Sequence, residues 1–296
     1  MLPQHGRYTF SPIVGRPRYA WPDGSGLAVY VALNLEHYAF GEGLREELVG
    51  GGHEPDVLNY SWRDYGNRVA AFRLKQLFAE LDIPLTFLVN SAVYDHSPGL
   101  LPALRGPQDE VAAHGRTNSE AQGVLDEEGE AALIREATEI IARQEGRRPE
   151  GWLGPWLSES RVTPDLLHEA GYRYVLDWCM DDQPVWLRTR GGRILSVPYP
   201  QELNDSSTIV GRRESAAVFA DMIIDQFDEM LEQSRTQPLV FALALHPYVI
   251  GQPFRLRHLR RALTHLAQHR QNVWFTTAGA IAEHAMAVEA AGTPLS

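Results

Sequence analysis

Residues 110–120 read Glu-Val-Ala-Ala-His-Gly-Arg-Thr-Asn-Ser-Glu. An apolar run that ends at His114 and continues into a glycine and polar residues is typical of a strand leading into a loop. In α/β folds such loops usually carry the chemistry. If residues 114–118 form a helical turn, His114 and Asn118 lie on one face and could share a ligand. The structural alternative is a histidine satisfied at the strand end, with Asn118 as a cap.

A second stretch repeats this pattern of a buried strand followed at once by polar side chains. Residues 27–35 read Leu-Ala-Val-Tyr-Val-Ala-Leu-Asn-Leu, which predicts a strand buried on both faces. Glu36 and His37 follow directly. A carboxylate beside an imidazole is costly to bury unless both groups are paired, so this position indicates function. The alternative is a charged strand end that reaches solvent.

The rest of the chain alternates between predicted strands and helices. We expect further strands at residues 85–89, 110–113, near 148–156, at 174–176, 194–198, 239–245 and 273–276. We expect helices at 65–81, 98–104, 126–145, 163–170, 215–233, 254–269 and 278–290, and a long loop at 41–61. Polar residues follow most of the strands, among them Tyr199, Asn204 and Asp205. This arrangement predicts an α/β barrel with one active face.

The composition limits the classes of function. Of 296 residues, 44% are hydrophobic, which suffices for a large core. We expect a single barrel domain at residues 27–296, preceded by an N-terminal arm at residues 1–26 that carries four prolines. The net charge of −11 argues against nucleic acid and against an anionic membrane as partners, because both bind basic surfaces.

Location and assembly are also predicted from the sequence. No apolar run approaches the roughly 18 residues that span a bilayer, and the N-terminus lacks the features of a signal peptide. With Cys179 as the only cysteine, no internal disulfide can form, which fits a reducing compartment. We therefore expect a cytoplasmic protein. The arm between Tyr8 and Trp21 carries aromatic groups that no predicted helix covers, so we expect a homo-oligomer.

Five segments carry a family resemblance. In chain order they are Leu-Asn-Leu-Glu (33–36), Ala-His-Gly-Arg-Thr-Asn (113–118), Arg-Pro-Glu-Gly-Trp (148–152), Asp-Asp-Gln-Pro (181–184) and Leu-His-Pro-Tyr (245–248). This order resembles the polysaccharide deacetylase superfamily of the NodB type over residues 27–284. It is most similar to the branch of peptidoglycan-deacetylase-like proteins and the allantoinases of urate breakdown. The resemblance implies a distorted (β/α)7 barrel that hydrolyses amide bonds, often with a divalent metal held by one aspartate and two histidines.

The sequence departs from the family pattern at the implied metal site. The family's aspartate pair falls on Asn34 and Glu36, or in the other register on Glu36 and His37. Strand alternation favours the first register, because residues 34 and 36 share a face. The second metal-binding histidine of the family is Asn118 here. The implied ligands are therefore Glu36, His114 and Asn118, with His37 as a substitute. Because an amide is a poor zinc ligand, we expect weak binding of a divalent ion such as zinc, and no certain cofactor.

The residues suggest a division of catalytic tasks. Amide hydrolysis needs an activated water, a polarised carbonyl and an acid for the leaving nitrogen. We predict Glu36, His114 and His246 as catalytic residues, with Glu36 taking the proton of the water and His246 acting as acid or oxyanion stabiliser. The predicted substrate-binding residues are Asn34, His37, Arg68, Trp152, Trp156, Asp181, Asp182 and Tyr248. Core packing for the tryptophans, a solvated loop for the aspartates and an ion pair for Arg68 are the alternatives.

These observations lead to a hydrolase of carbon–nitrogen bonds other than peptide bonds. We expect its substrate to be a small amide, in particular a cyclic amide or ureide, opened by activated water with weak or no metal dependence. One alternative is a metal-dependent N-deacetylase of an N-acetylated sugar or glycan. A second alternative is a catalytically inactive binding protein, which the amides Asn34 and Asn118 favour.

Overall fold

A single mixed sheet organises the fold of the computed structural model, which describes residues 4–42, 47–50 and 54–296. The sheet has nine strands within these ranges, in the order β6-β7-β5-β4-β3-β2-β1-β8, and β9 also pairs with β1. The strands are β1 (Leu27–Leu35), β2 (Leu85–Val89), β3 (Glu110–Ala113), β4 (Gly151–Trp152), β5 (Tyr174–Val175), β6 (Val185–Thr189), β7 (Gly192–Ser196), β8 (Leu239–Leu245) and β9 (Val273–Thr276). Only β6 and β7 pair antiparallel.

The strand β1 lies next to the end of this order and pairs with three other strands. Along one edge it pairs with β8, while on its other edge β9 pairs with residues 27–30 and β2 with residues 31–35. The segment after β7 returns to this region, because Asn204 forms a parallel bridge with Ala244 of β8. The sheet therefore curls into a half-barrel of the predicted (β/α)7 type, with the carboxyl ends of its parallel strands at one mouth.

The two faces of β1 serve different purposes. Its odd-numbered residues, such as Leu27 and Leu33, join the large core beneath the surrounding helices. Its even-numbered residues Ala28, Tyr30 and Ala32 join a second cluster inside the curl. Because side chains alternate along a strand, position 34 continues the inner row. The polar end of β1 is thereby directed into the barrel mouth.

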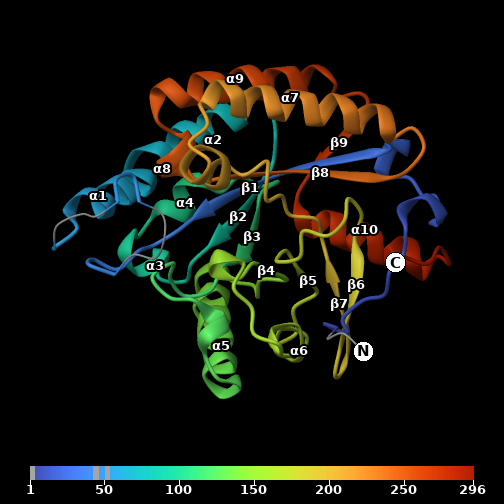
Figure 1. The fold of residues 1–296 in the computed structure, drawn as a ribbon, viewed down its shortest axis with the longest axis horizontal. Coiled ribbons are helices and arrows are strands. Elements are labelled where there is room, and N and C mark those ends of the chain that lie inside the picture. The colour runs from blue at the N-terminus through green and yellow to red at the C-terminus, as the bar shows by residue number, and fades with distance from the viewer. Residues whose placement is uncertain (1–3, 43–46, 51–53) are drawn as a thin grey trace.

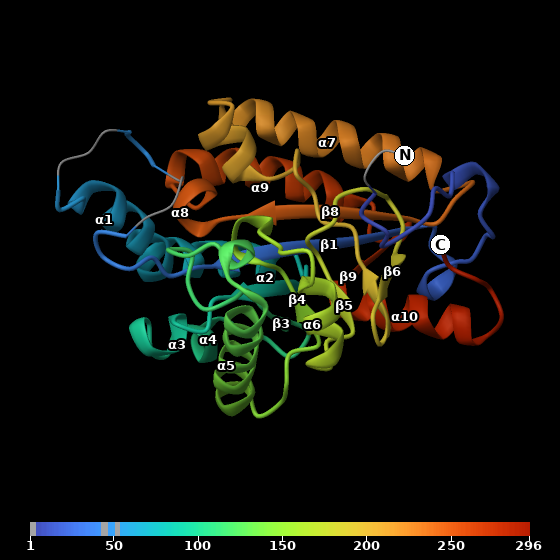
Figure 2. The same cartoon turned by 60° about the horizontal axis from the view of Figure 1, so that its bottom comes forward.

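Helices cover the outer face of the sheet. The helices α7 (Ala216–Gln233) and α9 (Pro253–Gln268) lie side by side along β8 and β1 (Figures 1 and 2). The helix α10 (Ala278–Ala290) instead packs its buried side chains against the inner cluster. The remaining α-helices are α1 (Val57–Tyr65), α2 (Ala71–Glu80), α3 (Val93–His96), α4 (Leu100–Leu104), α5 (Glu127–Glu145), α6 (Thr163–Glu169) and α8 (Pro247–Ile250). All elements pack on one sheet, so the chain forms a single domain.

Two sequence predictions of secondary structure were wrong in detail. The helix expected at residues 65–81 begins at Val57, inside the expected loop, and contains a π-helical turn at Gly66–Ala70. Residues 43–46 and 51–53 of that loop lie outside the described residues. The strand β6 was not predicted, although Val185 and Leu187 are buried at alternate positions. It forms a hairpin with β7, which starts at Gly192 and not at residue 194.

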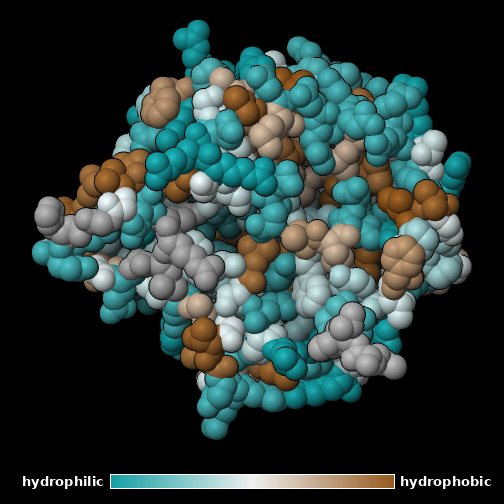
Figure 3. All heavy atoms as spheres, in the orientation of Figure 1, coloured by the Kyte–Doolittle hydropathy of each residue, from teal (hydrophilic) through white to brown (hydrophobic). Residues whose placement is uncertain are grey.

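The N-terminal segment from residue 4 to residue 26 lies against the barrel with only two short 3-10 turns, Ile13–Gly15 and Pro22–Gly24. Trp21 is buried in the inner cluster and donates its Nε1 hydrogen to Leu239 O at 2.9 Å. Phe10 and Val14 remain 92% and 84% exposed. Trp21 is thus covered within the chain, and the face in Figure 3 shows hydrophobic residues in small separate groups.

Along the described ranges, no helix combines the length and the apolar character that a bilayer-spanning segment requires.

Candidate active site

The polar groups predicted at the strand ends meet in one pocket. A cavity of about 230 Å³ at the barrel mouth is lined by Asn34, Glu36, His114, Asn118, Trp156 and His246, among others. Asn34 lies on β1, and Glu36, His114 and His246 each directly follow a strand, namely β1, β3 and β8. Because parallel strands bring their carboxyl ends to the same edge, residues 78 to 210 positions apart become neighbours.

Glu36 is the centre of this pocket. Its Oε1 lies 3.4 Å from Nε2 of His114 and 3.5 Å from Nε2 of His246. Its Oε2 accepts hydrogen bonds from the hydroxyl groups of Tyr38 at 3.0 Å and Tyr248 at 2.9 Å. The carboxylate is buried, so these four groups replace the water that it loses on folding.

This environment keeps Glu36 ionised. Burial alone would raise the pKa of its carboxyl group, but the charge of His246 and the contacts with His114 and Tyr248 outweigh burial and lower the pKa to about 2. A carboxylate with so low a pKa is a poor acceptor of a proton from water. Glu36 is therefore better suited to stabilise positive charge on the two imidazole rings than to act as the general base.

The other ring nitrogen of each histidine has a fixed partner. Nδ1 of His114 lies 2.8 Å from Leu153 O, and since a carbonyl can only accept, Nδ1 carries the proton. Nδ1 of His246 lies 2.7 Å from Asp205 Oδ1, and the His246 backbone N–H also donates to this carboxylate. Burial raises the pKa of Asp205, while the contacts with His246 oppose that rise. Both rings thus direct Nε2 at Glu36.

The orientation of the two imidazole rings restricts which of their nitrogen atoms carry protons. An ionised carboxylate has no hydrogen to donate, so at least one Nε2 must carry a proton for the contacts with Glu36 to be attractive. His246 lies between two carboxylates, Glu36 and Asp205, and both stabilise a positive charge on its ring. The geometry therefore favours an imidazolium at His246, while Nε2 of His114 faces the same carboxylate oxygen.

Asn118 is occupied by a set of hydrogen bonds that joins three strand ends. Its Oδ1 accepts from Nδ2 of Asn90 at 3.0 Å, and its backbone N–H donates to His37 O at 2.9 Å. Asn90 also donates to His114 O and accepts from the backbone of His37 at 2.9 Å. We call Asn90 and Asn118 the amide clip. It ties the segments after β1, β2 and β3 together.

The predicted metal ligands Glu36, His114 and Asn118 do not fit a zinc site as they stand. The Asn118 oxygen is turned to Asn90, which leaves two ligands, whereas catalytic zinc usually has three from the protein. Glu36, His114 and His246 do not replace this set. Among the described His, Cys, Asp and Glu side chains, they form no group whose ligand atoms all lie within 4.8 Å of one another. The carboxylate oxygen instead lies between the two rings.

His37 and Arg68, which were predicted to bind substrate, lie outside the pocket. The His37 ring stacks on His96 with a centroid distance of 3.8 Å, because position 37 faces away from the inner row of β1. Burial and the neighbouring His96 lower the pKa of His37 to about 4, so the ring is neutral at pH 7. The Arg68 side chain is 75% exposed on the helical surface and pairs with Asp64. Neither His37 nor Arg68 therefore lies in the pocket where its predicted contact with substrate would be made.

The two tryptophans divide between core and pocket. Trp152 is fully buried on β4 and packs against Tyr172, so its predicted place in the pocket wall was wrong. Trp156 does line the pocket, and its Nε1 donates to Asn118 O at 3.0 Å. Tyr248 lies behind Glu36 and donates to it, and it is not among the groups that line the cavity.

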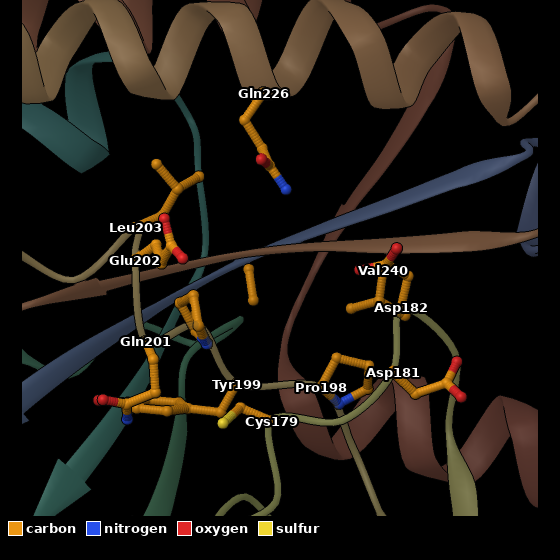
Figure 4. A pocket seen from close by; sticks show the side chains of 12 residues that line it. Cys179, Asp181, Asp182, Pro198, Tyr199, Gln201, Glu202, Leu203, Gln226 and Val240 are labelled. Atoms are coloured by element: carbon orange, nitrogen blue, oxygen red, sulfur yellow. The ribbon is translucent and has the colours of Figure 1, made fainter. Parts of the chain in front are cut away.

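The aspartates Asp181 and Asp182 line a neighbouring cavity of about 520 Å³. In Figure 4 they lie on one side of this cavity, while Tyr199 and Gln201 lie on the other. The Asp181 carboxylate forms an ion pair with Arg16 of the N-terminal segment at 2.6 Å. Asp181 and Asp182, which were predicted to bind substrate, therefore lie outside the pocket that holds Glu36. Tyr199 and Gln201 form a wall shared by the two cavities.

Sequence reasoning missed the groups that support the predicted centre. Tyr38 and Asp205 received no role, although Asp205 had been noted among the polar residues beyond the strand at 194–198. Asn34 was placed correctly, and its Nδ2 donates to Tyr199 at 3.3 Å and to Leu245 O at 3.2 Å. The Asn34 Oδ1 has no partner and is buried in the pocket, so it is available to accept from a bound molecule.

The chain is similar to known proteins in sequence and in fold. No family model matches the chain. The chain is 24% identical over 293 residues to a putative polysaccharide deacetylase of Schizosaccharomyces pombe, covering 89% of this chain and 91% of that protein. It is 22% identical over 260 residues to the peptidoglycan deacetylase of Helicobacter pylori, covering 77% and 87% of the two chains.

Solved structures agree over nearly the whole chain. The crystal structure of Puue allantoinase matches with a TM-score of 0.82 and 26% identity, covering 95% of this chain and 98% of that chain. A probable polysaccharide deacetylase from Pseudomonas aeruginosa matches with a TM-score of 0.81 and 26% identity, covering 93% and 97%. With the curled sheet and the polar groups at its strand ends, these similarities support a hydrolase of the NodB-type polysaccharide deacetylase superfamily, which acts on carbon–nitrogen bonds other than peptide bonds.

Proposed function

We propose that the chain opens a carbon–nitrogen bond of a small cyclic amide or ureide, by acid/base catalysis with weak or no dependence on a metal. The observation that carries this proposal is the position of Glu36 Oε1 between the Nε2 atoms of His114 and His246 in a cavity of about 230 Å³. Drug-sized ligands usually occupy about 300–1,000 Å³. A single small ring suits this cavity better than a polymer does.

The charges of the site support a division of roles. A water molecule beside Glu36 and His114 can donate one hydrogen to each, and His114 Nε2 is the accepting nitrogen that takes the proton. The imidazolium of His246 is the acid, since Asp205 holds its Nδ1 and leaves Nε2 to face the pocket. Glu36 stays ionised and offsets the positive charge. This assignment moves the role of base from Glu36, where the sequence had placed it, to His114.

The reaction then proceeds in two steps, attack by water and breakage of the carbon–nitrogen bond. The water oxygen attacks the carbonyl carbon as its proton moves to His114, which gives a tetrahedral intermediate. The unpaired Asn34 Oδ1 accepts from an N–H of the ring and helps to orient it. Breakage of the carbon–nitrogen bond transfers the His246 proton to the leaving nitrogen. The product is one open chain that carries a carboxylic acid, which loses its proton to solvent, and a free amide, urea or amine nitrogen. Transfer of a proton from His114 to His246 through solvent restores the starting state.

A second candidate is N-deacetylation of an acetylated sugar. The curated relatives named above are deacetylases by name, and one of the two solved neighbours is as well. Tyr199 and Gln201 line both the pocket and the larger cavity beside Asp181, so the larger cavity could hold further sugar units. The same acid/base groups would then release acetate.

One experiment separates the candidates. Purified protein is incubated with allantoin, hydantoin and dihydrouracil and, in parallel, with N-acetylated glucosamine oligomers, and products are measured by mass spectrometry. We expect ring opening by wild type and by Arg68→Ala, a matched surface control, and its loss in His246→Ala. Acetate release without ring opening would refute the proposal in favour of the deacetylase. If neither the cyclic compounds nor the acetylated oligomers are consumed, the result would favour an inactive binding protein.

Metal dependence is tested on the same activity. After treatment with a strong chelator and dialysis, we expect most of the ring-opening rate to remain. Complete loss of the rate, with recovery on addition of one equivalent of zinc, would contradict the weak-metal part of the proposal. A cytoplasmic location and self-association remain predictions, and light scattering at micromolar concentration tests the second.

A further inference from the structure

A cluster of metal-ligand side chains lies on the outer surface of α7 and α9, away from the barrel mouth. His265 belongs to α9, His269 directly follows its last residue, and Asp228 belongs to α7. Residues four positions apart on a helix lie on one face, so both imidazoles point the same way. The two helices lie side by side in Figures 1 and 2, which brings Asp228 to the same face.

The distances within the cluster suit a single ion. One ligand atom from each of Asp228, His265 and His269 lies within 4.8 Å of the other two, and no other such group occurs among the residues that the structure describes. Nε2 of His265 lies 2.7 Å from Asp228 Oδ1, and the two ring centroids are 5.2 Å apart. Ligands of a tetrahedral zinc ion at about 2.0–2.2 Å are roughly 3.3 Å from one another. Small side-chain rotations reach that spacing.

The surroundings hold the two rings while leaving the cluster open. Phe227, which is fully buried, contacts both imidazoles, with centroid distances of 6.1 Å to His265 and 5.5 Å to His269. The side chains of His265 and Asp228 are 29% and 50% exposed. An apolar floor therefore restricts the rings on one side, and an ion can enter from solvent on the other.

We propose that Asp228, His265 and His269 bind one divalent transition-metal ion of the zinc class, with water completing the coordination. Two imidazoles and one carboxylate are a ligand set that zinc and its neighbours accept, whereas magnesium and calcium prefer oxygen ligands alone. The ion links α7 to α9 in the layer that covers β8, the strand that His246 directly follows. Its role is to stabilise this layer, and it is independent of the chemistry in the pocket.

The proposal is tested by titrating chelator-treated, dialysed protein with zinc chloride in a calorimeter. We expect one site that is kept in Glu36→Gln, which alters the pocket, and in His258→Ala, a control on the same helix. Loss of even an outer-shell partner typically weakens metal binding 10- to 100-fold. His265→Ala, His269→Ala and the milder Asp228→Asn should therefore each weaken binding by at least about tenfold.

Thermal unfolding gives an independent readout. Zinc should raise the midpoint of wild type and of both controls, because a ligand that binds only the folded state stabilises it, and should not raise that of the histidine variants. Absence of zinc binding by wild type, or binding unchanged in both histidine variants, overturns the proposal. Circular dichroism of the variants confirms that these partly exposed positions tolerate substitution.

Discussion

Replacing Glu36 by Gln tests the electrostatic account of the pocket through protein stability. The pKa of this carboxyl group is about 2 in the folded chain against 4.5 as the ordinary value. This difference of about 2.5 pH units, at about 1.36 kcal/mol per unit, corresponds to roughly 3 kcal/mol. Because the folded value is the lower one, the stabilisation is fully present above about pH 4.5. It is lost as the pH falls towards 2.

The measurement is urea unfolding followed by circular dichroism at several pH values between 7 and 2.5. We expect wild type to exceed Glu36→Gln in free energy of unfolding at pH 7, and we expect this difference to shrink by roughly 3 kcal/mol as the pH falls. The matched control is Glu139→Gln, an exposed position on α5. Its difference from wild type should stay within about 0.5 kcal/mol at every pH.

Two outcomes would refute this reasoning. A difference between wild type and Glu36→Gln that does not change with pH would show that the carboxyl group has an ordinary pKa in the folded chain. A difference that grows as the pH falls would show that burial prevails and that the group is protonated in the fold. In either case Glu36 would regain the role of general base that the sequence suggested.

Three further predictions concern activity and backbone strain. His246→Ala should lower kcat by about 10²- to 10⁴-fold, the usual range for a general acid. Asp205→Asn should lower kcat by a smaller factor and shift the pH profile. Equal kcat values in wild type and both variants would contradict the proposed proton transfer. Arg68→Ala should leave kcat and KM unchanged, because its side chain is 75% exposed and pairs only with Asp64 among the described contacts, and a large rise in KM would restore its predicted site role. Gly115→Ala should destabilise the fold by at least roughly 1–2 kcal/mol, since Gly115 has φ of 62° and an added Cβ would lie 2.6 Å from Pro155, and an unchanged urea midpoint would count against that strain.

The strand ends were predictable because the signal is local. Apolar runs such as Leu27–Leu35 and Leu239–Leu245 fix buried parallel strands, and a polar residue directly after each run is thereby placed at the barrel mouth. Glu36, His114 and His246 were found in this way. The hairpin strand β6 was missed because its mixed composition, Val-Trp-Leu-Arg-Thr, carries a weaker pattern than a fully buried run.

The partners of these groups were not predictable in the same way. Asp205 meets His246 across 41 positions, through the bridge of Asn204 with Ala244. The hydroxyl groups of Tyr38 and Tyr248 both contact Glu36 and lie 3.0 Å from each other, and no spacing in the sequence predicts that arrangement. Arg68 and Trp152 were misplaced for a related reason, because motif resemblance does not say on which face of its element a side chain lies.

The amide clip has a consequence for how this site can change by mutation. Converting Asn118 to histidine would supply a metal ligand, yet it would also remove one of the two acceptors of the buried Asn90 Nδ2 and leave one of its hydrogens unpaired. An unsatisfied buried donor costs about 1–3 kcal/mol. The two positions should therefore show epistasis, in which a histidine at 118 is tolerated well only after Asn90 has been replaced. A single Asn118→His change therefore carries a stability cost that a prior change at Asn90 would avoid.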